Sequence, residues 1–184
     1  MRRRRLSHAI ALAGALAGAL AAILLPAAAG AAAPSDLEPE RVRAALIDRV
    51  ARFVEWPGTP SSQFVLCVAD EHPQLAYLRS YYDSATIAAL PVQVRPLRKN
   101  ETLAGCHAAI LVPGETADIN RMRSQADQAH VLLFGEGTGM ARHGVHIGFY
   151  PGAKHMVLEV NRKSLEASGL KASFRLLEVA KIVE

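Results

Sequence analysis

Apolar and polar positions follow two different periodicities along the chain after residue 34. Short runs that are apolar throughout, or that alternate apolar with polar side chains, predict strands. We place these strands at residues 64–69, 90–97, 107–112 and 131–134. Apolar residues that recur three and four positions apart predict helices. We place these helices at residues 38–55, 73–82, 116–128, 162–168 and 173–183, and we expect Phe174, Leu177 and Ala180 of the last helix to face inward.

The last third of the chain also contains a predicted hairpin. Strands at 145–150 and 156–160 flank Pro151-Gly152, a dipeptide typical of turns. Asn161 is suited to cap the helix that follows, and Gly169 is suited to end it.

The order of these elements predicts the fold class. Helices alternate with short apolar strands in the first half, and a hairpin and further helices follow. We therefore expect a single α/β domain with a mixed, mostly parallel sheet and helices on both faces, ending in a C-terminal hairpin plus helices.

Residues 1–33 have the pattern of an export signal. Arg2 to Arg5 give a positive start, residues 10–25 are apolar and uncharged, and mostly small residues follow Pro26. We expect cleavage near Ala29–Ala31, which leaves one exported domain over residues 34–184 without stable membrane insertion. The alternative is an uncleaved membrane anchor, because the apolar run approaches the ~20 residues that span a bilayer.

Removal of this segment changes the charge of the protein. The full chain has 21 Lys and Arg against 17 Asp and Glu. Arg2 to Arg5 account for four of those cations, so the remaining 17 balance the 17 acids. Nucleic-acid binding needs an excess of cations that face phosphates, and we expect none here.

Two cysteines, Cys67 and Cys106, lie in the exported part of the chain. Thiols outside the cytoplasm tend to oxidise in pairs, and a bridge between these two would close a loop of about 40 residues. Two buried free thiols are the alternative that the sequence leaves open.

The chain lacks the residue patterns of a catalytic or metal site. It has no Gly-x-Ser-x-Gly, Cys-x-x-Cys or His-Glu-x-x-His motif. Cys106 and His107 are adjacent, but neighbouring strand residues point to opposite faces and cannot act as thiolate and base. We therefore expect no catalytic residue, no metal and no cofactor. The histidines are expected on the surface or packed in the hairpin, and Trp56 half-buried at a helix end.

The glycines at 135, 137 and 139 suggest a phosphate-binding loop, but the Gly-Lys-Ser/Thr ending of such a loop is absent. We expect residues 135–144 to form a mobile surface loop instead.

Several segments together resemble one known family. They are FVEWP at 53–57, GCHAAI at 105–110, GVHIGF at 144–149, LEVN at 158–161, SGLK at 168–171 and LLEVA at 176–180. In this order and spacing they resemble the YfiR family of small exported proteins, over nearly the whole chain after the signal.

The resemblance implies a compact, often dimeric α/β protein of the periplasm that is not an enzyme. In the best-understood type, the protein binds the periplasmic sensor domain of an inner-membrane diguanylate cyclase and represses it. Repression lowers cyclic di-GMP and restrains biofilm formation, and redox or envelope stress relieves it. Cys67 and Cys106 match a cysteine pair of the family, whereas the second pair found in some relatives is absent here.

The resemblance also implies where a partner binds. Glu159 and the helix near Leu165 match the region of the family's contact surface, and we add the segment around Ile147. An alternative function is a periplasmic small-ligand binder. Its site would lie at the carboxyl ends of the strands, near Asp70, residues 113–116 and Gly135. A hydrolase is a third and weaker hypothesis, because no nucleophile–base pair accompanies it.

Overall fold

The computed structural model describes residues 39–58, 61–112 and 116–184. The predicted export signal therefore lies outside the described residues. The helices are α1 (Pro39–Ala51), α2 (Leu75–Tyr82), α3 (Thr116–Ala129), η1 (Ala141–His143), α4 (Arg162–Ala167) and α5 (Phe174–Val179). The strands are β1 (Val54–Glu55), β2 (Phe64–Ala69), β3 (Thr86–Ile87), β4 (Leu90–Leu97), β5 (Ala108–Leu111), β6 (Leu132–Glu136), β7 (Ile147–Pro151), β8 (Met156–Asn161), β9 (Lys171–Ala172) and β10 (Lys181–Val183).

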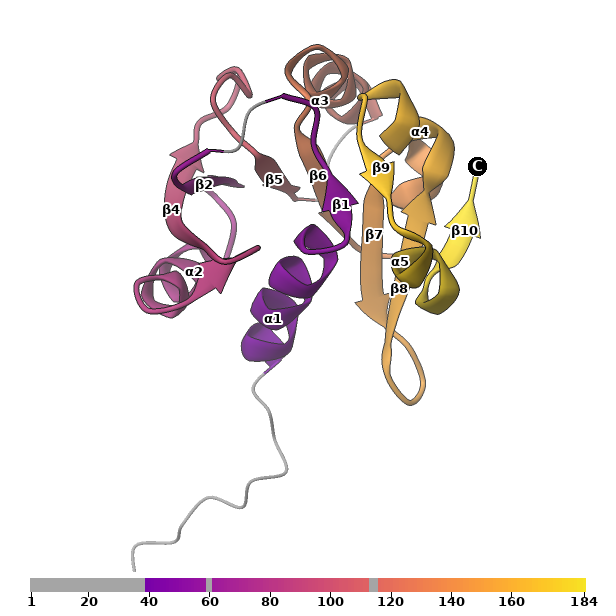
Figure 1. Ribbon diagram of the computed structural model, residues 1–184, viewed down its shortest axis with the longest axis horizontal. Helices are drawn as coiled ribbons and strands as arrows, with labels where there is room; N and C mark the ends of the chain where they lie inside the picture. Colours follow the sequence, from indigo (N-terminus) through magenta and orange to yellow (C-terminus); the bar gives the residue numbers. More distant parts are fainter. Residues whose placement is uncertain (1–38, 59–60, 113–115) are drawn as a thin grey trace, which may run out of the picture. The chain divides into compact units, whose positions relative to one another are not determined.

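Eight of these strands form one mixed sheet, in the order β10-β8-β7-β6-β5-β2-β4-β3 (Figure 1). The central strands β4, β2, β5, β6 and β7 are parallel neighbours. β7 and β8 form the predicted antiparallel hairpin, and β3 pairs antiparallel with β4. Strands β1 and β9 form a separate antiparallel pair. The predicted mixed, mostly parallel sheet is confirmed.

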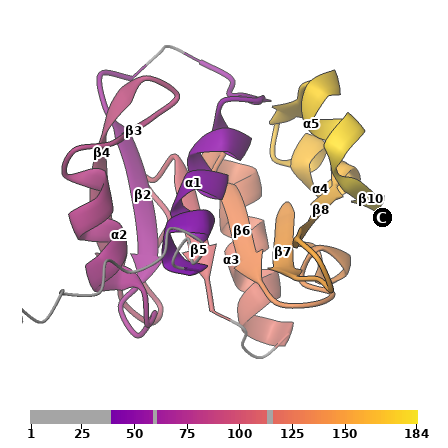
Figure 2. The ribbon, with the colours of Figure 1, turned by 90° about the horizontal axis from the view of Figure 1, so that it is seen from below.

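Helices cover both faces of this sheet, as the sequence predicts. The domain has two hydrophobic cores, one on each face of the sheet. Alternate residues of β2 contribute to one core or the other, because successive strand side chains point to opposite faces. Leu66 and Val68 pack with α1 and α2, whereas Val65 and Cys67 pack with α3. In Figure 2, α1 lies in front of the sheet and α3 behind it.

The first helix is shorter than predicted, since it ends at Ala51 rather than at residue 55. A tertiary interaction replaces its last turn. Val54 and Glu55 pair with β9, and the backbone N–H of Ser173 donates to the carbonyl of Phe53. The apolar pattern of residues 38–55 contains no sign of this partner strand, which lies more than 110 residues away.

The prediction of one helix over residues 173–183 is wrong. α5 ends at Val179, Ala180 is extended, and the last residues form β10. β10 runs parallel to β8 with Ile182 opposite Val160. Hydrogen bonds to β8 therefore satisfy the backbone that a longer helix would have satisfied internally. Phe174, expected to face inward, is 74% exposed.

The glycine-rich segment is only in part the surface loop that the sequence predicts, since residues 137–140 form a turn but both ends of the segment are packed. Gly135 lies within β6, and Met140 and Ala141 are buried where η1 begins. A Cβ atom at Gly135 would lie 2.8 Å from the Cε atom of Met140 and 3.2 Å from the Cγ1 atom of Val145. Gly135 therefore allows this segment to pack closely against the sheet.

Candidate functional site

The two cysteines form a disulfide on the α3 face of the sheet. Cys67 lies in β2 and Cys106 lies two residues before the start of β5, with Cα atoms 5.8 Å apart. Both side chains are buried, at 0% and 6% exposure. The Nη2 atom of Arg95 lies 2.9 Å from the Cys106 sulfur and donates to the carbonyl of Ala104 at 3.0 Å. The bridge is the one expected from the sequence.

The bridge occupies a place where many α/β domains have a helix. Within the described residues, no helix connects β4 to β5, and residues 98–107 form an irregular connection. Leu103 and Cys106 from this connection pack against Val65, Cys67 and Ala109. The disulfide therefore holds an irregular segment on the sheet where helix packing is missing.

A second arrangement is a fully buried histidine. His146 is 0% exposed, and its Nδ1 atom accepts the backbone N–H of Leu133 at 3.0 Å. Because Nδ1 accepts, the neutral ring carries its proton on Nε2, which lies 2.8 Å from the hydroxyl oxygen of Ser168. That hydroxyl then donates to the Oδ1 atom of Asp127 at 2.6 Å. Burial lowers the pKa of His146 to about 4.

This histidine network joins elements that are distant in sequence. It links the segment before β7 to α4 and to α3, and the carbonyl of Ser168 is also 2.8 Å from the His130 ring. The order differs from a catalytic triad, because the hydroxyl lies between imidazole and carboxylate. Ser168 is also 0% exposed, so its hydroxyl is not open to a substrate. The arrangement positions α4 on the sheet.

The sequence missed this network, although His146 is packed at the start of the predicted hairpin, one of the two placements expected for the histidines. The three partners are separated by 19 and 22 residues, so no local spacing signals them. His72 is also buried, at 6% exposure, and burial lowers the pKa of its ring as well.

The structure buries the three side chains predicted to touch a partner. Ile147, Glu159 and Leu165 are exposed by 0%, 2% and 0%. They lie in β7, β8 and α4 and contribute to the inside of the C-terminal part of the domain. In this conformation, only their exposed neighbours offer a partner direct contact.

Glu159 is a buried carboxylate with an incomplete set of partners. Its Oε1 atom accepts from the Nζ atom of Lys181 at 3.1 Å and from the Tyr150 hydroxyl at 3.2 Å. Its Oε2 atom is buried and has no hydrogen-bond partner among the described residues. Lys181 belongs to β10, so this ion pair holds the edge strand against β8.

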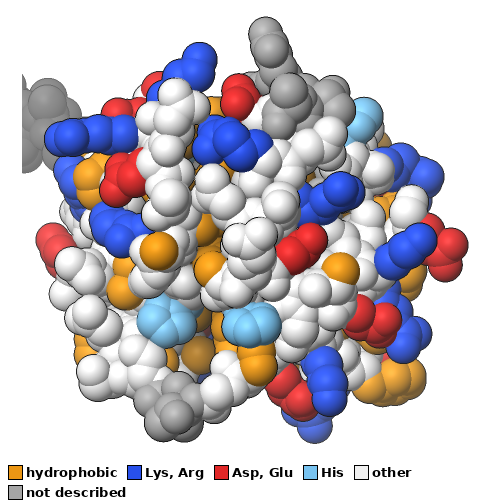
Figure 3. Space-filling view, turned by 90° about the horizontal axis from the view of Figure 1, so that it is seen from above, with side chains coloured by type: hydrophobic (Ala, Val, Ile, Leu, Met, Phe, Trp, Pro, Cys, Tyr) orange, Lys and Arg blue, Asp and Glu red, His pale blue; other side chains and the backbone are white. Residues whose placement is uncertain are grey.

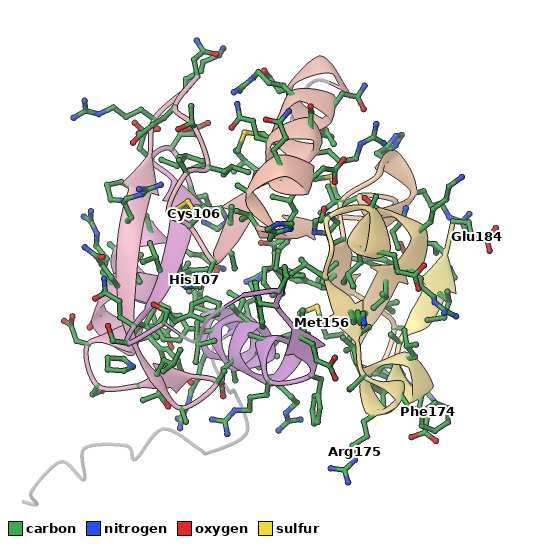
Figure 4. All side chains as sticks on the ribbon, turned by 45° about the horizontal axis from the view of Figure 1, so that its top comes forward. Cys106, His107, Met156, Phe174, Arg175 and Glu184 are labelled. Atoms are coloured by element: carbon green, nitrogen blue, oxygen red, sulfur yellow. A yellow bond between two sulfur atoms is a disulfide. The ribbon has the colours of Figure 1, made fainter. Side chains whose placement is uncertain are left out.

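Three large apolar side chains that lie close to Lys181 in the sequence are exposed. Phe174, Val179 and Ile182 are exposed by 74%, 75% and 44%, and they are the large exposed hydrophobic residues found in the described part of the chain. All three lie on α5 and β10, and we call them the C-terminal surface. Figure 4 shows Phe174 and the neighbouring Arg175 pointing away from the ribbon.

An aromatic groove lies around Trp56, at the amino ends of β2 and β5. The Trp56 indole N–H donates to the carbonyl of His107 at 3.3 Å, and the indole ring packs edge-on against Phe64. Phe64 in turn stacks on the His107 ring, whose pKa burial lowers. The groove has a volume of about 440 Å³ and includes His130. Figure 3 shows two histidine side chains next to each other beside apolar atoms on this side of the molecule.

Trp56 is half-buried, as predicted, but it follows β1 and does not stand at a helix end, because α1 already ends at Ala51. Among the residues that the structure describes, no three His, Cys, Asp or Glu side chains are grouped as metal ligands. None of the helices in the described ranges has the length and apolar character that crossing a membrane requires.

Comparison with known proteins places these features in a family. The family model described as YfiR/HmsC-like matches residues 40–181. A conserved domain protein from Vibrio cholerae O1 biovar El Tor has a similar solved structure, with a TM-score of 0.57 and 16% sequence identity. The match covers 82% of this chain and 62% of the Vibrio chain, and at this identity it shows the fold alone. No curated protein matches the sequence.

The chain therefore belongs to the YfiR/HmsC-like family. The family is a regulatory, non-catalytic one that acts in the periplasm.

Proposed function

We propose that this protein is a periplasmic repressor of an inner-membrane diguanylate cyclase. It binds the periplasmic sensor domain of that enzyme and favours its inactive state, which lowers cyclic di-GMP and biofilm formation. Such a regulator needs a higher affinity for one partner state than for the other, and no catalytic residue. The family membership supports this class of function.

The observation that carries the proposal is the C-terminal surface. Its three large apolar side chains are exposed within one nine-residue segment, and we infer that they act as an apolar patch of the kind that marks interaction sites. The free edge of β10 lies at the end of the sheet and can accept hydrogen bonds from another strand. Arg175, Glu178 and Lys181 are exposed within the same segment and supply a charged rim.

This surface also gives a role to the buried residues near it. Glu159 holds Lys181 and thereby β10 in place, and Leu165 fixes α4 in the core. We infer that these residues support the contact surface from inside, whereas Phe174, Val179 and Ile182 form the contact.

The test combines binding with a cellular readout. Phe174→Ser and Val179→Ser together should abolish capture of the purified sensor domain and should fail to lower cyclic di-GMP in a deletion strain. Ala45→Ser, at an exposed position of α1, is the matched control and should behave as wild type. Cyclic di-GMP that stays unchanged when the gene is deleted would exclude the repressor role. Full binding by the double variant would exclude this surface.

Export and dimerisation are further parts of the proposal. We propose that residues 1–33 are removed near Ala29–Ala31, which N-terminal sequencing of the exported protein tests; an intact Met1 contradicts it. A homodimer follows from the family resemblance. Its mass in light scattering should be twice that of one chain, and a monomer at micromolar concentration would contradict it.

A further inference from the structure

A cavity lies where the parallel strands end, far in sequence from the C-terminal surface. β2 is central to this site: the chain passes from β2 to β4 on one side of it and then to β5 on the other. In open α/β sheets, ligands bind at such a reversal, outside the carboxyl ends of the strands. The last residues of the three strands, Ala69, Leu97 and Leu111, all line this cavity.

The inside of the cavity is apolar and its rim is charged. Leu97, Leu111, Ile119 and Met122 are each at least nine-tenths buried and supply apolar walls. The charged residues that line it are Glu71, Arg98, Lys99, Asp118 and Arg121. Three cations against two carboxylates favour an anion at the rim, whereas the walls favour an apolar group below it.

Arg121 is the group best placed to hold that anion. Its Nη2 atom lies 3.5 Å from the Oδ1 atom of Asp118, a contact at the outer limit of a hydrogen bond. Its Nη1 atom is buried and has no hydrogen-bond partner in the described part of the protein. The Arg121 side chain as a whole is 35% exposed, so part of it is open to a carboxylate, with which a guanidinium forms charge-assisted hydrogen bonds.

The connection that closes one side of the cavity is held in a fixed conformation. The backbone N–H of Arg98 donates to the Oε2 atom of Glu101 at 3.0 Å, and the N–H of Glu101 donates to the carbonyl of Arg98. Asn100 has a φ of 69° within this turn. Lys99 is thereby placed at the rim by a structured turn.

The size of the cavity limits the ligand. Its volume is about 180 Å³, below the ~300–1,000 Å³ of pockets for drug-sized ligands. We propose that this cavity binds a short carboxylic acid with a branched apolar chain. The carboxylate pairs with Arg121 and Lys99, and the chain lies against Leu97, Leu111 and Met122. This site goes beyond the repressor function and does not depend on it.

The test uses two probes of nearly equal shape. We would titrate the oxidised protein with 4-methylpentanoate and with its neutral amide, following backbone amide signals by NMR. The carboxylate should bind with a dissociation constant on the order of 1 mM, as expected for eight non-hydrogen atoms. The amide should bind at least tenfold more weakly, and the shifted signals should come from β5, α3 and the turn at residues 98–101.

Variants separate this site from general anion binding. Arg121→Gln should weaken binding of the carboxylate at least tenfold, and Lys99→Gln, at an exposed position, should weaken it a fewfold. Arg79→Gln, an exposed arginine of α2, is the matched control and should leave binding unchanged. If Arg121→Gln fails to fold, Lys99→Gln and the amide still decide the question.

Several outcomes would overturn the proposal. They are equal binding of the amide, unchanged binding by Arg121→Gln or Lys99→Gln, and the absence of saturable shifts in the cavity. Inorganic phosphate that binds as tightly as 4-methylpentanoate would also overturn it, because the apolar walls would then have no role. Each outcome can occur whether or not the protein represses a cyclase.

Discussion

Reduction of the Cys67–Cys106 disulfide should remove a large part of the stability of this domain. The two residues are 39 positions apart, and the chain-entropy relation for a loop of that size gives about 4 kcal/mol at 25 °C. The free energy of unfolding of a typical domain is only ~5–15 kcal/mol. The bridge also holds the irregular connection before β5, which has no helix to pack it.

The cleanest perturbation is reduction of the wild-type protein, because it removes the covalent link and almost no packed atoms. Urea unfolding curves of the oxidised and reduced forms give the two free energies and the two m values. The signals are far-UV circular dichroism and the fluorescence of Trp56, the single tryptophan of the chain. The reduced form should also show a larger m value, because its unfolded state exposes more surface.

Two variants separate the link from its surroundings. Cys67→Ala with Cys106→Ala should have a stability close to that of the reduced protein. Arg95→Met removes the contact with the Cys106 sulfur but keeps the bridge, and should cost only about 0.5–1.5 kcal/mol. A difference below about 1 kcal/mol between oxidised and reduced protein, with equal m values, would refute the loop-entropy reasoning.

Three further predictions concern other parts of the domain. The unfolding free energy should fall as the pH drops from 6.5 to about 4, because the unfolded chain binds a proton that buried His146 does not. The loss should reach about 3 kcal/mol, and His146→Asn should flatten that pH profile in urea titrations; an unchanged profile would contradict the assignment. Lys181→Met should destabilise the domain by about 1–3 kcal/mol because Glu159 loses its cation, and Glu159→Gln in the same chain should recover most of this loss in a double-mutant cycle. Additive losses would show that the pair is not coupled. Gly152→Ala should lower the melting temperature, since its Cβ atom would lie 2.8 Å from both the His155 carbonyl oxygen and a Val157 methyl group; the clash should cost about 1–3 kcal/mol. An unchanged melting temperature would show that the turn adjusts.

Much of the fold could be predicted from local pattern. The strand at 64–69 was predicted with the bounds of β2, because a buried strand needs an apolar run that the sequence displays directly. The strand at 90–97 was predicted with the bounds of β4 from its alternation of apolar and polar residues. The hairpin around Pro151-Gly152 was predicted for a similar reason, since turn residues act locally.

The candidate sites depended on contacts that local pattern does not encode. The expected partner residues Ile147, Glu159 and Leu165 lie inside, and the contact surface that we propose instead includes Phe174, a residue expected to face the core. Of the expected ligand residues, Asp70 lies between two residues that line the cavity, whereas Gly135 is absent from its lining and residues 113–115 lie outside the described residues. No motif around Arg121 in the sequence indicates that this residue could bind a ligand.

The sequence by itself determined which segments are extended or helical through most of the chain, and it limited the cysteines to one possible pair. The tertiary structure decided how the last ten residues divide into helix and edge strand, and it decided that His146 stays neutral in the interior. The physical reason is the range of the interactions. A helix period or a turn residue acts over a few positions, whereas strand pairing and burial depend on partners brought together from 20 to 120 residues away.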